Sequence, residues 1–499
     1  MEILSPATLH LSPPAVQRPA YDPATVTPGI LHLGAGAFHR AHQAVYTDEC
    51  LGHGDTSWGI IAANLHSTAL REALGHQGGL YALEHSSAAG RRLRIIAAIR
   101  ACLVGRDDPA ALVAAMARPE IRILSLTITE KGYCLDPASG DLAASHADIV
   151  HDLAHRDQPR SAPGFICAAL RQRMAARIAP FTLLSCDNLA RNGRVLKRVL
   201  MQFAELRDPA LARFIGNHVA SPATMVDRIV PATTPGDRER IAAGLGLYDT
   251  APVVGEAFAQ WIIEDNFPAG RPDWAAGGAT FVHDAGPWET MKLRLLNGAH
   301  STLAWLGLLA GKQTVADAMA DPAIASFVAR LMREEIAPVL HAPPGADLVA
   351  YIAVLLARFG NPFLQHRTAQ IAGDSSQKLP QRLLPTIRAR LAANLPFPLL
   401  ALAVAAWIRC TSGLDDAGGA IEFQDPLAAE LRRRALAAGG SPAALVASLT
   451  GIEAIFGHDL PHDLPRDPRF RHAVTQALEA LAAHGVRPAM ARAMAANTA

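Results

Sequence analysis

The chain of 499 residues has almost no net charge, because 46 lysine and arginine residues are balanced by 45 aspartate and glutamate residues. Proteins that bind nucleic acid or anionic membranes usually carry a clear excess of positive charge. The lack of this excess argues against both kinds of partner and favours a small-molecule substrate. The length suffices for two or three domains with sizeable cores.

Paired cysteines and grouped metal ligands are also lacking. No two cysteines are separated by only two residues, which argues against a zinc site and against a disulfide framework, and favours reduced thiols. His39 and His42 have no Asp, Glu or Cys nearby at ligand spacing, so we expect packing or cofactor contacts from them and no metal. The six cysteines are Cys50, Cys102, Cys134, Cys167, Cys186 and Cys410.

Long apolar runs and an export signal are not found either. The first residues contain prolines and an early glutamate, where a signal peptide needs a basic start and an unbroken apolar run. The longest apolar segment, residues 395–408, contains Pro396 and Pro398 and is too short to span a bilayer comfortably. We therefore expect a soluble cytoplasmic protein.

Strand-like and helical segments alternate in the first half of the chain. Residues 29–33 form a short apolar run that leads into the glycine turn 34–36, and a helical pattern follows at 38–51. A later helical stretch covers 109–117. This alternation predicts an α/β fold with a mostly parallel sheet covered by helices. The other strand-like runs are 58–63, 80–83, 93–99, 121–128 and 181–185.

The glycine turn is a candidate dinucleotide site. Gly34 and Gly36 would let the backbone approach a pyrophosphate, whose charge would lie at the N-terminus of the following helix. The motif departs from the usual fingerprint, because His39 stands at the third glycine position and Asn64 stands where a carboxylate normally binds the adenosine ribose. Arg71 lies near this position, and an arginine there would favour the phosphate of NADP. The choice between NAD and NADP therefore stays open at this point.

From about residue 287 the sequence changes to long helical patterns rich in alanine, leucine and arginine. We expect the chain to divide there, into a dinucleotide-binding domain of residues 1–286 and a helical domain of residues 287–499 that binds substrate and carries catalytic groups. The helical patterns cover 312–337, 347–359, 383–393, 398–408, 426–438 and 468–483.

Four polar residues at the start of this second region fall on one side of a predicted helix. At about 100° per residue, Lys292, His300 and Asn297 lie at roughly 0°, 80° and 140°, and Glu289 lies near 60°. An amine that exchanges a proton, an amide that donates to an oxyanion and an imidazole that holds a hydroxyl suit the interconversion of an alcohol and a ketone, which needs a hydride carrier. The alternative is a buried structural network or a solvated helix face, with Asn-Gly as a turn signal.

Five motifs resemble the long-chain mannitol dehydrogenase family. LHLGAGAFHRAHQ, SLTITEKGYC, SCDNLARNG, MVDRIVPAT and KLRLLNGAHS occur here in that family's order, and the resemblance covers nearly the whole chain. The most specific element is the Lys-x4-Asn-x2-His pattern. The resemblance implies a Rossmann-like N-terminal domain, a mostly α-helical C-terminal domain and catalysis without a metal.

The resemblance also implies roles for the residues of these motifs. Lys292 matches the general acid and base, Asn297 and Asn188 match the amides that hold the oxyanion, and His300 matches the residue that orients the substrate. Glu289 matches a glutamate implicated in proton exchange with solvent.

Further matches concern the nucleotide side and the substrate site. Asp227 matches a residue that lines the cofactor and substrate site. Without the resemblance, Asn188 would be interpreted as a turn residue at a strand end and Asp227 as a surface or capping carboxylate. The residues that match the nucleotide side are Gly34, Gly36, Phe38, His39, Arg40, Thr127 and Thr129.

The segment 366–382 bears on the substrate. HRTAQIAGDSSQKLPQR resembles the fructuronate reductases of the family more than the mannitol 2-dehydrogenases, which tend to have an arginine where Gln370 stands. A sugar acid brings a carboxylate that needs a cationic partner. Lys378, Arg367 and Arg382 are the nearby candidates, although each also fits a surface charge.

We therefore expect an NAD-dependent oxidoreductase that reduces D-fructuronate to D-mannonate. The near alternative is the same chemistry on mannitol and fructose or another polyol. An alternative of a different class is a catalytically silent nucleotide-binding or sugar-sensing protein. The set of Lys292, Asn297, His300 and Asn188 argues against the sensor, because a sensor needs no lysine for proton transfer. The oligomeric state is not predicted.

Overall fold

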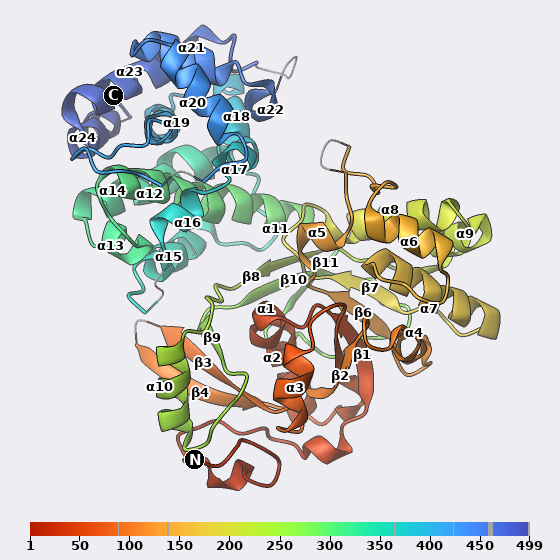
Figure 1. Cartoon of the computed structure of the whole chain (residues 1–499). Coiled ribbons are helices and arrows are strands. Elements are labelled where there is room, and N and C mark those ends of the chain that lie inside the picture. Colours follow the sequence, from red (N-terminus) through yellow and green to blue (C-terminus); the bar gives the residue numbers. More distant parts are fainter. Residues whose placement is uncertain (88, 137–138, 364–365, 423, 458–462, 498–499) are drawn as a thin grey trace. The chain divides into compact units, whose positions relative to one another are not determined.

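The computed structural model describes residues 1–499 except 88, 137–138, 364–365, 423, 458–462 and 498–499. The chain divides into two compact units, Met1–Gly286 and Pro287–Ala499 (Figure 1). The first unit is built on β-sheets, and the second is built from helices.

A five-stranded parallel sheet forms the framework of the first unit, in the order β5-β2-β1-β6-β7. From the central strand β1 the chain moves out to β2 and β5 on one side, and it later adds β6 and β7 on the other side. The carboxyl ends of β1 and β6 thus flank the topological switch point, where open α/β sheets bind ligands. The predicted α/β fold with a Rossmann-like sheet is confirmed. The strands are β1 (Pro28–Leu33), β2 (Gly59–Asn64), β5 (Ile99–Val104), β6 (Ile123–Leu126) and β7 (Thr182–Ser185).

Helices cover both faces of this sheet. Leu31 belongs to the same hydrophobic core as buried residues of α4 (Pro109–Ala117) and α7 (Ala162–Ala176), whereas its neighbour Ile30 belongs to the core on the other face, with α2 (Gln43–Gly52). Successive side chains of a strand point to opposite faces, and both faces are buried, which explains why these strands are continuous apolar runs. The remaining helices of this unit are α3 (Ala69–Gly75), α5 (Thr129–Gly132), α6 (Ala147–Ala154), α8 (Asn192–Glu205), α9 (Pro209–His218) and α10 (Pro235–Leu245).

Two three-stranded sheets complete the first unit, whereas the sequence predicts one mostly parallel sheet. In the order β4-β3-β9, β3 is antiparallel to β4 and parallel to β9. In the order β11-β10-β8, β10 is parallel to β11 and antiparallel to β8. Their strands are β3 (Tyr81–Ser87), β4 (Gly90–Ile96), β8 (Thr224–Asp227), β9 (Val253–Glu256), β10 (Gln260–Glu264) and β11 (Thr280–Val282).

The strand predicted at 93–99 is wrong as a single element. It joins the end of β4 at Ile96 to the start of β5 at Ile99, and these two strands belong to different sheets. All residues from Ile95 to Ile99 are completely buried. No polar residue therefore marks the place where the chain passes from one sheet to the other.

The helix predicted at 38–51 is also interrupted. The short helix α1 (Ala37–Ala41) ends at His42, whose φ of −124° and ψ of −93° lie outside the helical region. The His42 ring stacks on Phe38 at 5.0 Å and meets Trp261 of β10 edge-on at 5.5 Å. The ring of Trp261 comes from more than 200 positions later in the chain, so the local pattern carries no sign of the break.

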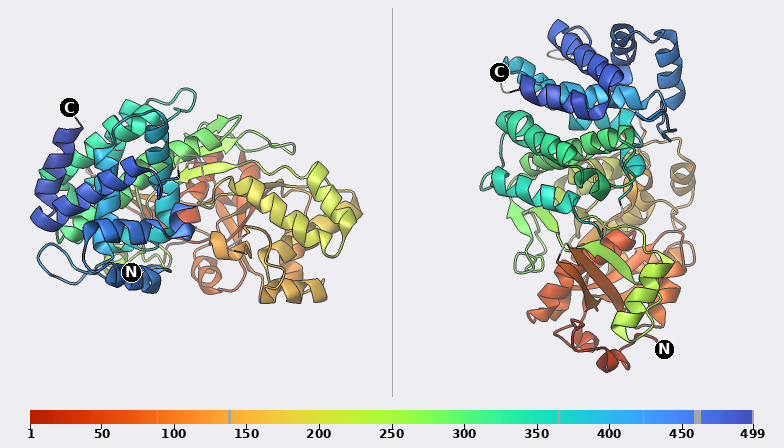
Figure 2. Two further views of the ribbon diagram at one scale, coloured as in Figure 1. Left: turned by 90° about the horizontal axis from the view of Figure 1, so that it is seen from above. Right: turned by 90° about the vertical axis from the view of Figure 1, so that its left-hand side faces the viewer.

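The second unit contains no β-strand in the part of residues 287–499 that is described (Figures 1 and 2). Nearly every side chain of α12 (Gly298–Leu309) and α19 (Pro398–Cys410) is buried, as expected for helices that are apolar on all sides. The predictions of helices at 347–359, 383–393, 426–438 and 468–483 are confirmed by α15 (Leu348–Phe359), α18 (Leu384–Ala392), α20 (Ala428–Ala437) and α23 (Pro468–His484). The other helices are α11 (Gly286–Met291), α16 (Thr368–Ala372), α17 (Ser375–Arg382), α21 (Pro442–Thr450), α22 (Glu453–Phe456) and α24 (Val486–Ala496).

The long helical pattern at 312–337 is divided into α13 (Val315–Met319), α14 (Pro322–Arg330) and a π-helical turn, η5 (Leu331–Ile336). The break after α13 falls at Asp321, whose carboxylate accepts the N–H of Ala323 at 3.0 Å and caps α14. Pro322 then occupies the first turn, where a missing N–H costs nothing. No helix in the described ranges combines the length and the apolar character needed to cross a membrane.

Candidate active site

A glycine turn follows β1 at the switch point of the parallel sheet. Gly34 has a φ of +86°, and a β-carbon there would lie 2.2 Å from the backbone oxygen of Thr127, which follows β6. Gly34 is therefore required by both conformation and space. Gly36 begins α1 with no side-chain cap among the described residues, and a β-carbon there would meet only the Gly34 oxygen at 3.8 Å. The open backbone at Gly36 fits the close approach of a pyrophosphate.

A buried hydrogen-bond network holds this turn against the sheet. His32 Nδ1 lies 2.8 Å from Ser125 Oγ, and His32 Nε2 lies 2.8 Å from Thr127 Oγ1, which donates to the Gly34 oxygen at 2.7 Å. Burial lowers the pKa of His32 to about 3, so the ring is neutral. Thr127 thus lies beside the glycine turn. The sequence reasoning missed His32, for which a histidine inside an apolar strand was the available signal.

The other residues predicted for the nucleotide side have different environments. His39 is fully buried and stacks on His32 at 3.5 Å between ring centroids. The Arg40 guanidinium donates to the backbone oxygen of Ala251 and lies 5.4 Å from the centre of the Tyr81 ring. These contacts hold α1 inside the unit. Phe38 is half-buried and Thr129 is exposed.

Asp187 organises a second turn, at the carboxyl end of β7. Its carboxylate accepts the N–H groups of Ile128 at 3.1 Å and Thr129 at 2.9 Å, and the hydroxyl of Tyr133 at 2.7 Å. Thr129 has a φ of +63°, a strained conformation for a β-branched residue that the Asp187 bond helps to hold. Burial raises the pKa of Asp187 against the opposing effect of these three donors. The sequence reasoning selected the exposed neighbour Asn188 and missed Asp187, although both belong to the SCDN motif.

Asn192 connects this turn to the strand that carries Asp227. Its amide nitrogen donates to the backbone oxygens of Asp187 and Thr224, each at 3.0 Å, and its amide oxygen accepts the Thr224 N–H at 2.9 Å. Thr224 begins β8, and Asp227 ends the same strand and is buried. The side chain of Asn192 thereby links the segment of Asn188 to the strand of Asp227.

In the second unit, residues Lys292–Asn297 form a π-helical turn, η4, between α11 and α12. The N–H of Gly298 bonds to the oxygen of Leu293, five residues earlier. The angles predicted for an α-helix are therefore wrong for this segment. In a π-helical turn, residue i bonds to residue i+5, so residues five apart lie nearly on one face. The angle between Lys292 and Asn297 around the helix axis is therefore smaller than the roughly 140° of an α-helix. Both side chains are buried, and Glu289 on α11 is half-buried.

His300 lies in the first turn of α12 within an aromatic and cationic environment. Its ring stacks on Phe359 at 5.1 Å and meets His366 edge-on at 5.1 Å. Burial lowers the pKa of His300 well below its usual value, and the charges on His366, Arg382, Arg358 and Lys378 lower it further. The imidazole is therefore neutral. Phe359 and His366 were missed as site residues, although His366 was noted as the start of the 366–382 motif.

The three cationic candidates of segment 366–382 differ in their hydrogen-bond partners and in their exposure. Arg382 donates to Ser301 Oγ at 2.8 Å, has no acidic partner among the described residues, and burial lowers its pKa to about 10. Lys378 Nζ donates to the backbone oxygens of Ile371 and Gly373. Arg367 is exposed.

Gly298 explains how Arg382 comes close to η4. A β-carbon at Gly298 would lie 3.0 Å from the backbone oxygen of Arg382, so the end of α17 packs directly on the helix backbone. The Asn-Gly pair is therefore not a turn here. It lies within a continuous helical segment, and its glycine allows the backbone of Arg382 to pack closely against the helix.

Among the residues that the structure describes, no group of three or more His, Cys, Asp or Glu side chains is arranged to hold a metal ion.

Comparison with known proteins adds family evidence to this geometry. The family model of the mannitol dehydrogenase Rossmann domain matches residues 28–276, and that of the mannitol dehydrogenase C-terminal domain matches residues 284–482. D-mannonate oxidoreductase of Escherichia coli (strain K12) is 46% identical over 95% of this chain and 98% of that protein. Mannitol 2-dehydrogenase of Aspergillus terreus is 40% identical over 93% of each chain. The solved structure of Pseudomonas fluorescens mannitol 2-dehydrogenase, a ternary complex with NAD and D-mannitol, has a TM-score of 0.84 and 37% identity, and the match covers 99% of this chain and 100% of that chain.

Proposed function

This chain belongs to the mannitol dehydrogenase family of oxidoreductases, and we propose that it reduces the sugar acid D-fructuronate to D-mannonate with NADH. The family predicted from the five sequence motifs is confirmed. The sugar acid is favoured over a polyol by the positive charge around His300, and by the similarity to a D-mannonate oxidoreductase.

The proposed mechanism divides proton transfer from charge stabilisation. When bound, the nicotinamide supplies the hydride to the carbonyl carbon. Lys292 donates a proton to the carbonyl oxygen in the reduction, and its amine removes that proton from the alcohol in the reverse direction. The amides of Asn188 and Asn297 donate hydrogen bonds to the same oxygen, on which negative charge grows.

The other predicted residues orient the substrate and supply protons. The neutral imidazole of His300 forms a hydrogen bond with a hydroxyl of the sugar. The imidazole stays neutral because a charged ring at this buried position, beside other cations, would cost more free energy. Glu289, one helical turn before Lys292, relays protons between that lysine and solvent. Asp227 lines the site for cofactor and substrate.

Arg382 is our first choice for the partner of the substrate carboxylate. The Arg382 side chain is half-buried, and its guanidinium has only the Ser301 hydroxyl as a partner among the described residues. A carboxylate would therefore complete its hydrogen bonds and offset the cost of burying its charge. Lys378 ranks second, because two backbone oxygens already accept from its ammonium group. Arg367 ranks last because it is exposed.

The cofactor is proposed to be NAD, held by Gly34, Gly36 and Thr127 at the switch point. Arg71, the candidate partner for an NADP phosphate, forms an ion pair with Asp107 at 2.8 Å, which weakens the case for NADP. The ternary complex of the Pseudomonas fluorescens relative contains NAD, which supports the same choice here.

The test compares fructuronate with fructose as substrates, with NADH and with NADPH, by following nicotinamide absorbance. The variants are Arg382→Met, Lys378→Met and, as a matched control on the exposed part of the segment, Arg367→Met. We expect Arg382→Met to lower kcat/KM for fructuronate by about 10- to 100-fold, the usual effect of losing a charge-assisted hydrogen bond, and to change the value for fructose much less. Arg367→Met should change neither.

The outcomes separate the alternatives. If the unaltered enzyme uses fructose as efficiently as fructuronate, the polyol dehydrogenase alternative replaces the sugar-acid proposal. If Arg382→Met and Lys378→Met both weaken the two substrates equally, neither residue selects the carboxylate. Cofactor binding without turnover of any sugar or sugar acid would favour the sensor.

A further inference from the structure

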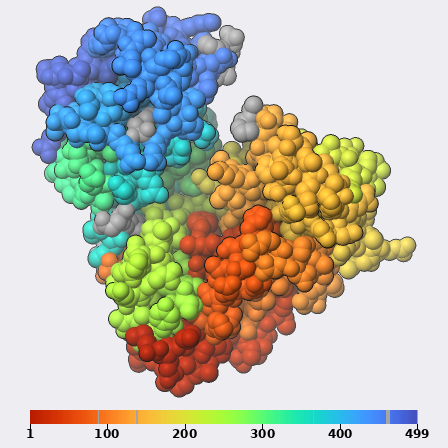
Figure 3. Space-filling model, in the orientation of Figure 1, coloured from red at the N-terminus to blue at the C-terminus, as the bar shows by residue number. Residues whose placement is uncertain are grey.

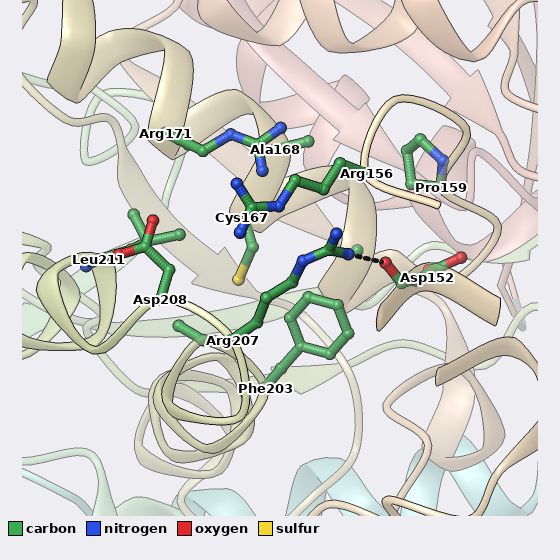
Figure 4. Close-up of a pocket in the computed structure, with 12 residues that line it drawn as sticks. Asp152, Arg156, Pro159, Cys167, Ala168, Arg171, Phe203, Arg207, Asp208 and Leu211 are labelled. Atoms are coloured by element: carbon green, nitrogen blue, oxygen red, sulfur yellow. Dashed lines mark hydrogen bonds between the residues drawn. The ribbon is translucent and has the colours of Figure 1, made fainter. Parts of the chain in front are cut away.

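A charged pocket lies in the first unit, among helices α6, α7, α8 and α9, which form an exposed flank (Figures 1 and 3). Arg156 follows α6, Arg171 lies on α7 and Arg207 follows α8, and their side chains extend toward the pocket from these three elements (Figure 4). Cys167 and Phe203 line it as well. None of these residues has a role in the proposed reaction.

The three arginines have few partners of their own. Arg156 is exposed and makes no hydrogen bond or ion pair with any described residue. Arg171 has a loose ion pair with Asp157, at 3.7 Å, and Asp157 is 96% exposed. Arg207 donates to a neutral group, the backbone oxygen of Asp152, at 2.9 Å. Most of the fifteen N–H donors that three guanidinium groups carry are thus left to solvent or to a ligand.

The guanidinium groups are close enough to affect one another. Burial lowers the pKa of Arg207, and the positive charges of Arg156 and Arg171 lower it further, while Asp157 opposes them. Surface arginines that repel one another can turn apart into water, because their side chains are long and flexible. An arrangement that keeps three of them around one pocket is stabilised when an anion binds between them.

The two aspartates that line the pocket are engaged elsewhere. The carboxylate of Asp152 accepts the N–H groups of Arg160 and Ser161 at 2.8 and 2.9 Å, and the Ser161 hydroxyl at 2.6 Å. The carboxylate of Asp208 accepts the N–H of Leu211 at 3.1 Å and caps α9. Within the described part of the chain, neither carboxylate forms an ion pair with the three arginines, so the guanidinium groups keep their capacity for an external anion.

We propose that Arg156, Arg171 and Arg207 form a binding site for a phosphoryl group. A tetrahedral phosphate offers oxygens in several directions to three planar guanidinium groups, whereas a carboxylate offers two oxygens in one plane. The cavity of about 30 Å³ holds about two water molecules by the usual measure. It therefore admits a single phosphoryl group and leaves any sugar or other body of the ligand outside, on the surface of the unit.

Calorimetric titration tests this site with two probes, inorganic phosphate and glucose 6-phosphate, with NAD present at saturation so that phosphate does not report on the cofactor site. The variant Arg156→Gln is the main test, because Arg156 makes no contact that the fold needs. We expect it to weaken binding about tenfold, and Arg171→Gln to act similarly. Arg213→Gln removes the same charge from an exposed position of α9 outside the pocket and should bind as the unaltered protein does.

The two probes distinguish the source of the phosphoryl group. Equal or tighter binding of glucose 6-phosphate identifies a phosphorylated metabolite as an acceptable ligand, and binding of inorganic phosphate alone identifies the free ion; both support the site. The proposal is overturned if neither probe binds, or if Arg213→Gln weakens binding as much as Arg156→Gln does. Because the readout is heat of binding, it is independent of whether the enzyme turns over fructuronate.

Discussion

In the first unit the polar groups of the candidate site stand at strand ends and depend on backbone atoms, whereas in the second they are side chains inside buried helices. Gly34 contributes conformation and close approach, and Asp187 binds two backbone N–H groups. Lys292 and His300 contribute an amine and an imidazole from helices that are part of the core. The first unit therefore suits binding of a cofactor by backbone atoms, whereas the second unit suits chemistry by individual side chains.

The largest expected effect comes from the second unit. Lys292→Ala should lower kcat by up to about 10⁴-fold in both directions, because it removes the proposed general acid and base. The Kd for NADH, measured by fluorescence titration, should stay nearly unchanged. Lys312→Ala, which removes a lysine of the same unit that has no assigned role, is the control. Substantial turnover by Lys292→Ala would show that the second unit does not supply the proton.

A pair of variants tests whether both units act on the reacting oxygen. Asn188→Ala in the first unit and Asn297→Ala in the second should each lower kcat by about 10²- to 10³-fold, the usual cost of losing one donor to an oxyanion. Single-turnover kinetics measure the chemical step directly. If only Asn297→Ala affects this step, charge stabilisation belongs to the second unit alone; a loss confined to KM means that the amide only binds substrate.

Two glycine variants test two contributions of the backbone in the first unit, one to stability and one to cofactor binding. Gly34→Ala should lower the free energy of unfolding by at least about 1 to 3 kcal/mol, because the left-handed conformation disfavours alanine and the new methyl group meets Thr127 at 2.2 Å. Gly36→Ala should leave stability unchanged, since its methyl group meets open space, and should raise the Kd for NADH if a pyrophosphate passes over it. Urea unfolding and NADH titration measure the two effects. Unchanged NADH binding in Gly36→Ala would contradict the backbone approach.

The last expected effect is a pH dependence of stability in the second unit. Glu335 is fully buried in η5, its carboxylate accepts the N–H groups of Leu399 and Leu400 at 2.8 Å each at the start of α19, and burial raises its pKa to about 7. The folded state therefore keeps a proton that the unfolded chain releases near its ordinary value of 4.5. Stability from this group is present below that value and is lost as the pH rises to about 7.

Glu335→Gln isolates this contribution. The difference in unfolding free energy between the unaltered protein and the variant should shrink by about 1.4 kcal/mol per pH unit between pH 5 and 7 and stay level above pH 7. Urea unfolding at several pH values measures it. A constant difference across that range would mean that Glu335 is ionised throughout and acts as an ordinary capping carboxylate.

Local patterns were sufficient for several elements. The strand and glycine turn of residues 28–36 follow from the apolar run and the glycines, and α15 and α23 follow from their helical periodicity. The five motifs, in their order along the chain, were sufficient to predict the family. These features depend on residues that are near one another in the sequence, where spacing determines geometry.

Contacts between distant residues decided the rest. The break at His42 accompanies a contact with Trp261, and the crossing between β4 and β5 is hidden in a uniformly buried run. The π-turn that brings Lys292 and Asn297 toward one face differs from an α-helix by a single residue in its hydrogen bonding, which a helical wheel does not detect.

The sequence by itself determined the family, the α/β and helical character of the two parts and the residue types available for chemistry. Only the tertiary structure showed that Arg382 differs from Lys378 and Arg367 in its burial and hydrogen-bond partners. It also showed that Asp187 binds the turn of Thr129 and that three arginines line one pocket. The physical reason is that burial and hydrogen-bond partners of a charged side chain are set by the neighbours that folding brings to it, and three cations in one motif look alike until those neighbours are known.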